Sequence, residues 1–211
     1  MNTPRNSNLP PVETTFCILA GGLSRRMGCN KALLPFLGQP LIQRILERIR
    51  PVTGEIFIIS DDQTSYNFLG LPVIPDQIPG RGVLGGLFTS LSVSSLPYVA
   101  PVPCDMPFIN PALLIFEMGL IQSSDADVVI PQSFNGLEPL HAVYRRDTCL
   151  PFVQEALFQN KQRLISWFDQ VNIQIISPDE VATYDPDGTT FLNINTPEDL
   201  ARAELIGIKE L

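Results

Sequence analysis

Residues 16–31 read Phe16-Cys-Ile-Leu-Ala-Gly-Gly-Leu-Ser-Arg-Arg-Met-Gly-Cys-Asn-Lys31, an apolar run that passes directly into a loop rich in glycine and arginine. The apolar part predicts a fully buried β-strand. Glycines allow the loop that follows to adopt positive φ angles and to bring backbone N–H groups close to an anion. This order predicts the first strand of an α/β fold, with an anion-binding loop at its carboxyl end.

This loop combines glycines, which give the backbone conformational freedom, with cationic side chains. The glycines are Gly21, Gly22 and Gly28, and the cationic residues are Arg25, Arg26 and Lys31. We interpret it as a cradle for a triphosphate, in which amides supply the geometry and cationic side chains neutralise charge. It is not a Walker A loop, because Ala32 follows Lys31 where a Ser or Thr would bind magnesium, and the dinucleotide fingerprint G-x-G-x-x-G is missing too. The alternative is a glycine-rich surface turn with solvated arginines.

Strands and helices are predicted to alternate along the rest of the chain. Short apolar runs predict strands at 56–60, 72–75, 98–103, 127–131, 140–144 and 191–194. Helical spacing and cap signals predict helices at 41–49, 83–94, 111–121, 147–157 and from 197 onward, with Asn110, Asp147 and Thr196 as N-caps. The alternation predicts an α/β fold: a three-layer, doubly wound, mostly parallel sheet with helices on both faces, of Rossmann-like type. We expect a flexible tail at 1–14 and a single domain at 15–211.

The net charge of the 211 residues is −8, from 14 Lys and Arg against 22 Asp and Glu. An acidic chain disfavours broad nucleic-acid binding, which depends on many contacts between cationic side chains and phosphates. Residues 1–50 nevertheless carry seven cationic and two acidic side chains (+5), whereas residues 51–211 carry seven and twenty (−13). We expect the basic segment to steer a triphosphate toward the loop.

The four cysteines, Cys17, Cys29, Cys104 and Cys149, are scattered along the chain, which holds a single histidine, His141. A structural zinc site needs four N or S ligands, usually in close pairs, so this class of site is disfavoured. The apolar run Phe16–Ala20 is too short for a signal peptide or a membrane span. We therefore expect a cytoplasmic protein with reduced thiols and no membrane partner.

Asp105 directly follows the apolar run Val99–Cys104. A carboxylate there is costly unless a cation pairs with it, and ligands of open α/β sheets bind at the carboxyl ends of strands. Magnesium is commonly held by one or two carboxylates together with substrate phosphates. The alternative role, capping the next helix, is already filled by Asn110. We interpret Asp105 as a magnesium ligand.

Other polar residues also stand at positions that suit a ligand. Asp76 ends the predicted strand 72–75, although a simple turn explains it as well on local grounds. His141 lies in an apolar run and is interpreted as a core or wall residue rather than a general base. Asn193 and Asn195 would point to one face of a strand, which suits a ligand as well as it suits bonding within a turn or cap.

Four stretches resemble a known family when they are taken together. They are LAGGLSRRMGCNKALLPFLGQPLI (19–42), PVPCDMPFINPALL (101–114), EPLHAVYRRDTCLPFVQEAL (138–157) and FLNINTPEDLARAE (191–204). The first resembles the opening of the NTP transferase (nucleotidyltransferase) superfamily. The set, in this order, resembles the molybdenum cofactor guanylyltransferase (MobA-type) family. The resemblance covers about Thr15 to Glu204 and implies a nucleotidyltransferase fold.

That family transfers GMP from GTP to molybdopterin carrying molybdenum, releases pyrophosphate and requires Mg2+. The resemblance implies GTP-binding roles for Leu19, Ala20, Gly21, Gly22, Lys31, Ser60, Asp76 and Asp105. It implies that Asp105 holds the metal and that Lys31, Asp105 and Arg26 are catalytic. Arg163, Asn193 and Asn195 match positions near the pterin substrate.

Two positions depart from the family pattern. Ser60 stands where the family commonly offers an asparagine to the nucleotide, and Asn30 precedes the lysine where an acidic residue is frequent. The second glycine of the LAGG run resembles the guanylyl branch, whereas LAAG is usual in the sister cytidylyltransferases. The resemblance also implies molybdoenzymes or cofactor-insertion proteins as partners.

Three other functions share part of this pattern. A cytidylyltransferase or a sugar-nucleotide transferase would contain the same opening loop. A non-catalytic NTP-binding partner protein would bind nucleotide without releasing pyrophosphate. A Rossmann oxidoreductase fits worst, because the loop after the first strand does not have the G-x-G-x-x-G fingerprint.

Overall fold

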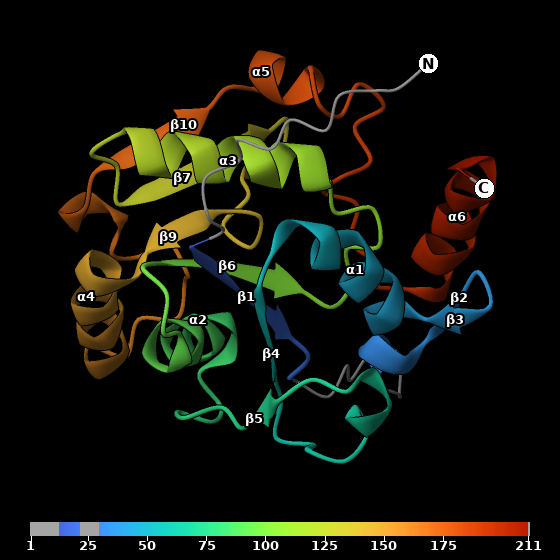
Figure 1. Ribbon diagram of the computed structural model, residues 1–211, viewed down its shortest axis with the longest axis horizontal. Coiled ribbons are helices and arrows are strands. Elements are labelled where there is room, and N and C mark those ends of the chain that lie inside the picture. The colour runs from blue at the N-terminus through green and yellow to red at the C-terminus, as the bar shows by residue number, and fades with distance from the viewer. Residues whose placement is uncertain (1–12, 22–29, 211) are drawn as a thin grey trace.

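The computed structural model describes residues 13–21 and 30–210 and contains an eight-stranded sheet (Figure 1). Its strands are β1 (Thr14–Leu19), β4 (Glu55–Ile59), β5 (Val73–Ile74), β6 (Tyr98–Pro103), β7 (Val128–Ser133), β8 (Gly136–Leu137), β9 (Val143–Arg145) and β10 (Ile173–Ile176). Their order is β10-β7-β9-β6-β1-β4-β5, with β8 paired to β7. A separate hairpin joins β2 (Pro35–Phe36) to β3 (Gln39–Pro40).

The helices are α1 (Leu41–Ile49), α2 (Gly82–Val93), α3 (Pro111–Ser123), α4 (Arg146–Phe158), α5 (Pro178–Ala182) and α6 (Pro197–Gly207). Short 3-10 helices lie at η1 (Lys31–Leu33), η2 (Arg50–Val52), η3 (Asn67–Leu69), η4 (Phe168–Gln170) and η5 (Ile208–Glu210). In the described part of the chain, none of the helices has both the length and the apolar character that crossing a bilayer requires.

The sheet is mostly parallel, as predicted. β1 pairs in parallel with β4 on one side and with β6 on the other, and β4–β5 and β7–β10 are parallel too. β9 is the exception within the main order, because it is antiparallel to both β6 and β7. The carboxyl ends of β1, β4, β5 and β6 therefore meet at one edge.

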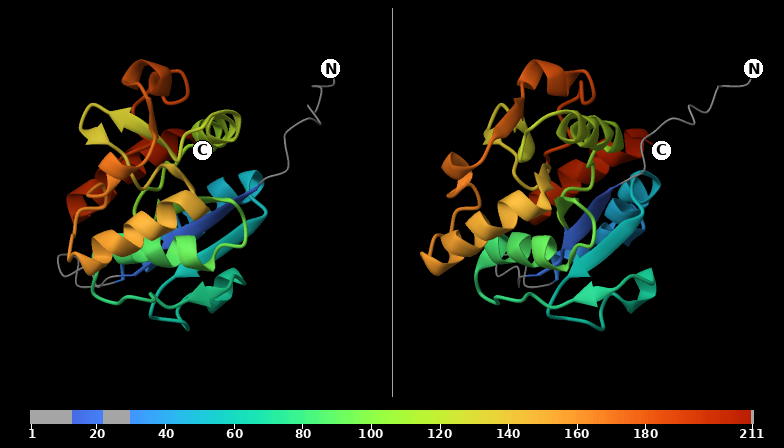
Figure 2. Two further views of the ribbon diagram at one scale, coloured as in Figure 1. Left: turned by 90° about the vertical axis from the view of Figure 1, so that its left-hand side faces the viewer. Right: turned by 60° about the vertical axis from the view of Figure 1, so that its left-hand side comes forward.

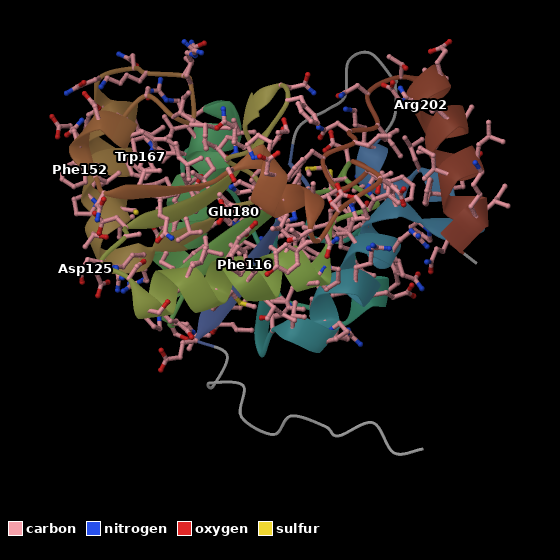
Figure 3. All side chains as sticks on the ribbon, turned by 90° about the horizontal axis from the view of Figure 1, so that it is seen from above. Phe116, Asp125, Phe152, Trp167, Glu180 and Arg202 are labelled. Carbon is pink, nitrogen blue, oxygen red and sulfur yellow. The ribbon has the colours of Figure 1, made fainter. Side chains whose placement is uncertain are left out.

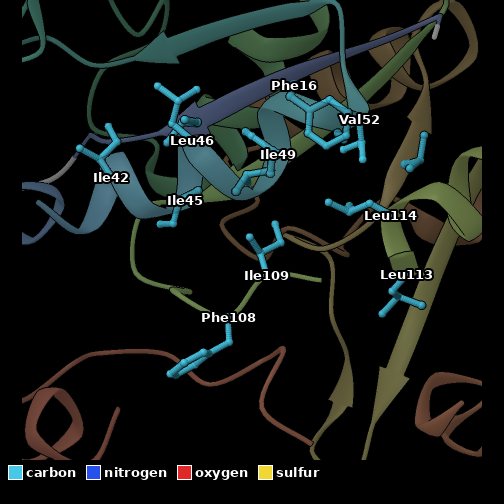
Figure 4. Packing of buried hydrophobic residues seen from close by; sticks show 14 of the residues in the cluster. Phe16, Ile42, Ile45, Leu46, Ile49, Val52, Phe108, Ile109, Leu113 and Leu114 are labelled. Atoms are coloured by element: carbon cyan, nitrogen blue, oxygen red, sulfur yellow. The ribbon is translucent and has the colours of Figure 1, made fainter. Parts of the chain in front are cut away.

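Helices cover both faces of the sheet, and each face has its own core (Figures 1 and 2). On the first face, α1 places Leu41, Ile42, Ile45, Leu46 and Ile49 in the interior. Their i, i+3, i+4 spacing produces a continuous apolar stripe, which Figure 4 shows packed around Phe16 of β1 and Leu114 of α3. On the second face, α2 and α4 pack on the sheet and on each other. The three-layer prediction is confirmed.

The helix α6 lies beside the β2–β3 hairpin (Figure 1), and Arg202 marks the position of α6 in Figure 3. A Cβ built on Gly207 would lie 2.6 Å from Cδ1 of Leu37 and 3.3 Å from Cζ of Phe36, so the helix and the hairpin are in close contact. A complete capping box begins α6, since Thr196 accepts a hydrogen bond from the Asp199 amide and Asp199 accepts one from the Thr196 amide. The predicted cap is confirmed.

Two strand predictions need correction. Residues 191–194 do not form a strand, because the hydrogen bond that joins the Ile194 amide to the Asp105 carbonyl, at 2.9 Å, lies beyond the end of β6 and begins no ladder with that strand. In the run 140–144, only Val143 and Tyr144 are in a strand. The backbone N–H of His141 instead donates a hydrogen bond to the Glu138 carbonyl in a turn, so β9 begins only at Val143.

The helix caps were predicted correctly at Asn110 but not at Asp147. Asn110 accepts hydrogen bonds from the Ala112 and Leu113 amides, and Pro111 begins α3. The N-cap of α4 is Arg145, so Asp147 lies within the first turn, where its charge favours the helix dipole. β10 and α5 were not predicted from the sequence.

Candidate active site

The carboxyl edge of the sheet contains a cavity of about 800 Å³. That volume suits a bound small molecule. Its described lining residues are Leu19, Ala20, Gly21, Asn30, Lys31, Ile59, Ser60, Asp61, Asp76, Gly80, Gly82, Val83, Gly86, Pro103, Cys104, Asp105, Leu140, Asn193 and Asn195. The loops after β1, β4, β5 and β6 thus converge as the sequence predicted.

The centre of this edge is a topological switch point. The chain runs from β1 through α1 to β4, whereas it runs from the adjacent β6 through α3 to β7, which lies in the opposite direction along the strand order. Connections that run in opposite directions from neighbouring strands leave a crevice between them. Gly21 and Asp105 follow these two strands and line the cavity there.

Lys31 and Asp105 form the charged centre of the cavity. The Lys31 Nζ lies 3.3 Å from Oδ2 of Asp105 and donates a second hydrogen bond, of 2.7 Å, to Oδ1 of Asn195. Both charged side chains are less than one-fifth exposed. Burial raises the pKa of Asp105, and the nearby ammonium of Lys31 opposes that rise. The cation that the sequence analysis required beside Asp105 is therefore present in the chain itself.

Asn30 anchors the start of the segment that carries Lys31. Its Oδ1 accepts the Ala32 amide at 3.1 Å, which caps η1, and its Nδ2 donates to the hydroxyl of Tyr66 at 2.8 Å. The buried Tyr66 donates in turn to the Ala20 carbonyl at 3.2 Å. A neutral amide at residue 30 is thus used to join the two ends of the loop that follows β1.

Asp76 and Ser60 lie at the ends of neighbouring strands. Asp76 Oδ1 accepts the Ile78 amide at 3.1 Å and the Thr89 hydroxyl at 2.9 Å, so the carboxylate is held by a local turn and by α2. Ser60 is buried, and its hydroxyl accepts the Asp62 amide at 3.2 Å. The turn interpretation of Asp76 is correct, and the same side chain also lines the cavity.

A family model described as the MobA-like NTP transferase domain matches residues 16–173. The chain belongs to this family. A probable molybdenum cofactor guanylyltransferase from Pelotomaculum thermopropionicum is 35% identical to it, over 92% of this chain and 94% of that protein. A relative of the same name from Carboxydothermus hydrogenoformans is 33% identical, over 93% of this chain and 98% of that protein.

A crystal structure of the molybdopterin-guanine dinucleotide biosynthesis protein A from Archaeoglobus fulgidus has the same fold. It matches with a TM-score of 0.80 and 26% identity, and covers 92% of this chain and 99% of that chain. The family resemblance and the fold class drawn from the sequence are both confirmed.

The residues predicted from the family motifs are only partly brought together. Leu19, Ala20, Gly21, Lys31, Ser60, Asp76, Asp105, Asn193 and Asn195 all line the cavity. Arg163 is exposed and is not among the described lining residues. Arg163 lies in the segment after α4. Arg81, in the loop after β5, donates to the Leu157 carbonyl in the last turn of that helix and to Asn160 Oδ1 just beyond it. Gly22 and Arg26 lie outside the described residues, as do Arg25 and Gly28.

The two asparagines of the fourth family motif share one side of the chain although no strand forms. Asn193 and Asn195 are exposed to the cavity, and Ile194 between them is fully buried. The side-chain Nδ2 of Asn193 donates to the Phe191 carbonyl at 3.1 Å, whereas the side-chain Oδ1 of Asn195 accepts from Lys31. The predicted alternation is therefore correct, and one of the two amides has a partner that the motif did not indicate.

His141 is a core residue, as predicted, and it has a buried partner on α3. Its Nδ1 lies 2.9 Å from Oε1 of Glu117, and neither side chain is exposed. Burial raises the pKa of Glu117, and His141 opposes that rise. The imidazole also packs edge-to-face on Phe191, at 5.3 Å between ring centroids. This pair joins α3 to the two segments that carry Leu140 and Asn193 into the cavity.

The described cysteines are free thiols, and burial determines their chemistry. Burial raises the pKa of Cys17, Cys104 and Cys149 to about 12. Cys104 lines the cavity beside Asp105, whose charge contributes to the raised pKa of the thiol after burial. A thiol with such a pKa stays protonated at neutral pH and is not a nucleophile.

Other cavity residues escaped the sequence analysis. Leu140 lies within the stretch 138–157 but carries no polar group to mark it, and Asp61 was not singled out either. Tyr66 does not line the cavity and acts through Asn30, from a loop to which no structure was assigned. Gly86 was not missed, because it belongs to the glycine-rich stretch 80–86, whose glycines were predicted to let a ligand approach the backbone. A Cβ on Gly86 would lie 3.3 Å from the Leu19 side chain, so glycine allows α2 to approach β1 closely.

Gly85→Ala provides a test of how tightly α2 fits around Asp76. A Cβ there would lie 3.0 Å from the Ile78 carbonyl oxygen and 3.2 Å from Oδ2 of Asp76. We expect the variant to gain nothing in stability and to bind GTP more weakly, because crowding cancels the usual gain from alanine in a helix. Gly119→Ala on the exposed side of α3 meets nothing within 4 Å and should gain about 0.5–1 kcal/mol. Urea unfolding and GTP titration check both; an equal gain in the two variants would contradict the expectation.

Proposed function

We propose that this protein transfers GMP from GTP to the terminal phosphate of molybdopterin in the molybdenum cofactor, which forms the guanine dinucleotide cofactor and releases pyrophosphate. The observation that carries the proposal is that the two halves of the chain both line the cavity that contains the Lys31–Asp105 ion pair. The first half of the chain supplies one wall, which includes Ala20, Gly21 and Asp76. The second half supplies Leu140, Asn193 and Asn195. Two substrates can therefore meet at the charged centre.

In this mechanism the nucleotide lies against the loops after β1, β4 and β5, and the acceptor lies against the segment at 193–195. An oxygen of the acceptor phosphate forms a bond to the α-phosphorus of GTP. The bond from that phosphorus to the oxygen bridging the β-phosphate breaks, and its electron pair leaves with pyrophosphate. The acceptor is already an anion, so no strong general base is needed. This agrees with a buried His141 and with thiols that stay protonated.

Catalysis then depends on position and on charge neutralisation. Lys31 places an ammonium at the centre of the cavity, where the developing charge on the phosphates is expected. Arg26 remains a predicted catalytic residue outside the described part of the chain. The Ala20 amide already donates to the Ile59 carbonyl at 3.0 Å, so the carboxyl end of β1 offers the Gly21 amide as a further donor.

We propose that Asp105 binds Mg2+. The residues fit that ion: Asp105 presents a carboxylate to the cavity, and magnesium is usually completed by substrate phosphates and water. Within residues 13–21 and 30–210, no group of three His, Cys, Asp or Glu side chains gathers to hold a metal. When bound, magnesium supplies neutralising charge at the phosphate oxygens.

Pyrophosphate release tests the proposal directly. With Mg2+ and molybdopterin present, we expect GTP to support pyrophosphate release at least tenfold better than CTP, and to protect the protein better against thermal unfolding. A preference for CTP would assign the chain to the cytidylyl branch. Protection by GTP without pyrophosphate release, when active molybdopterin is supplied, would instead indicate a nucleotide-binding protein without transferase activity.

A further inference from the structure

Lys31 is held by a residue that lies 164 positions away along the chain. The Nζ of Lys31 donates to the neutral amide oxygen of Asn195 at 2.7 Å, which is shorter than the 3.3 Å to the carboxylate of Asp105. An ammonium has three donors, so these two contacts leave one for a further acceptor. Because the amide is uncharged, it fixes the direction of the ammonium without neutralising it.

Asn195 is itself held by the cap of α6. Its backbone N–H donates to Oδ2 of Asp199 at 2.9 Å, and the same oxygen accepts the Thr196 amide at 2.9 Å. The other end of α6 packs on the β2–β3 hairpin through Gly207, and that hairpin follows Lys31 directly in the chain. The N-terminal end of α6 therefore holds the Lys31 side chain through Asn195. The C-terminal end of the same helix holds the segment that follows Lys31.

We propose that Asn195 is a positioning residue for Lys31, and that it aims the ammonium at the triphosphate of GTP before any acceptor binds. This inference rests on the proposed function, because it takes GTP as the ligand of the cavity. A free lysine side chain loses rotamer entropy when it binds, so a side chain that is already held binds a phosphate more tightly. Asn195 thereby acts on the nucleotide, although its motif resembles a pterin-side element.

Asn193 provides a matched comparison. It lies two residues away, lines the same cavity and carries the same amide, but its Nδ2 donates to the Phe191 carbonyl. Alanine at residue 195 keeps the backbone N–H that binds Asp199, so the cap of α6 should survive the substitution. The two variants therefore separate the contact with Lys31 from a general effect of removing an amide from this wall.

The test is calorimetric titration of GTP into the full chain, with neither molybdopterin nor any divalent ion present. We expect Asn195→Ala to weaken GTP binding about tenfold, the scale of losing one hydrogen bond to a charged group, and Asn193→Ala to change it less than twofold. In a Lys31→Met background, Asn195→Ala should have no further effect, because the residue acts through the lysine. Circular dichroism of each variant checks that the fold is intact.

Three results would overturn the inference. They are an equal loss of GTP affinity in Asn193→Ala, a loss in Asn195→Ala that appears only when molybdopterin or Mg2+ is added, and an undiminished loss in the Lys31→Met background. The first would indicate a general effect of this wall, the second an action on acceptor or metal, and the third an action independent of Lys31. Failure of the unaltered protein to bind GTP at all would instead reject the proposed function.

Discussion

Asp105→Asn is expected to lower GMP transfer by about 100-fold or more while it stabilises the nucleotide-free protein at neutral pH. The loss of activity follows from removing the carboxylate that pairs with Lys31 and is proposed to hold magnesium. The gain in stability follows from burial, which raises the pKa of Asp105 above its ordinary value of 3.8. An inactive variant that is more stable cannot have lost its activity by unfolding.

The pH dependence of that gain has a definite sign. A carboxyl whose pKa is raised in the folded state contributes stability below its ordinary pKa and loses that contribution as the pH rises through the raised value. The ionised Asp105 therefore destabilises the fold at pH 7, and asparagine avoids this cost. Urea unfolding without nucleotide or metal should show the advantage of Asp105→Asn at pH 7, and the advantage should vanish near pH 3.5, below the ordinary pKa of 3.8.

Lys31→Met should lower the transfer rate by a similar factor of about 100, because it removes a preorganised charge from the same centre. Lys209→Met is the matched control, since Lys209 is exposed in η5 and is not a described lining residue of the cavity. The measurement is steady-state pyrophosphate release with GTP, Mg2+ and molybdopterin. Near-normal transfer by Asp105→Asn or Lys31→Met, with magnesium as the metal, would reject the assigned roles.

Glu117→Ala and His141→Ala are each expected to destabilise the fold by about 3–5 kcal/mol, because each leaves the other member of a buried pair without its partner. Neither side chain is exposed to water that could replace the lost contact. The double variant Glu117→Leu/His141→Phe should be much less destabilised than either single variant, since apolar residues of similar volume often replace a buried pair at little cost. Urea unfolding of the three variants measures the difference.

The loss of folding stability caused by His141→Ala should also grow as the pH rises. His141 opposes the rise that burial causes in the pKa of Glu117, so its removal raises that pKa further. A raised pKa in the folded state means that stability is lost with increasing pH. Unfolding at pH 8 should therefore show a larger loss of stability than unfolding at pH 5.

For the double variant Glu117→Leu/His141→Phe, a loss of stability equal to the sum of the two single losses would show that the pair does not act as a unit.

The phosphate side of the site could be predicted because its signals are local. A strand, a glycine loop and Lys31 lie within one short stretch, and Asp105 directly ends another strand. The parallel sheet then brings these loop starts to one edge without further information. The apolar stripe of α1 and the caps Asn110 and Thr196 are equally local, and the structure has all three.

The remainder depends on contacts between distant residues, which a single sequence does not reveal. The bond from Lys31 to Asn195 and the pair of Glu117 with His141 each join elements that no spacing relates. The run 191–194 has the composition of a strand, but its hydrogen bond to Asp105 lies beyond the end of β6, so no pairing with that strand develops. In each case the local structure is determined by how the whole sheet packs, and the sequence of the segment alone does not determine it.

The distance along the chain between Lys31 and Asn195 has a consequence for the order of folding. Closing so long a loop costs more entropy than forming the neighbouring pairs of β1 with β4, so this contact belongs among the late events. A newly made polypeptide can therefore complete most of its sheet while its lysine still moves freely. Full affinity for the nucleotide is therefore expected only in molecules that have completed this last contact.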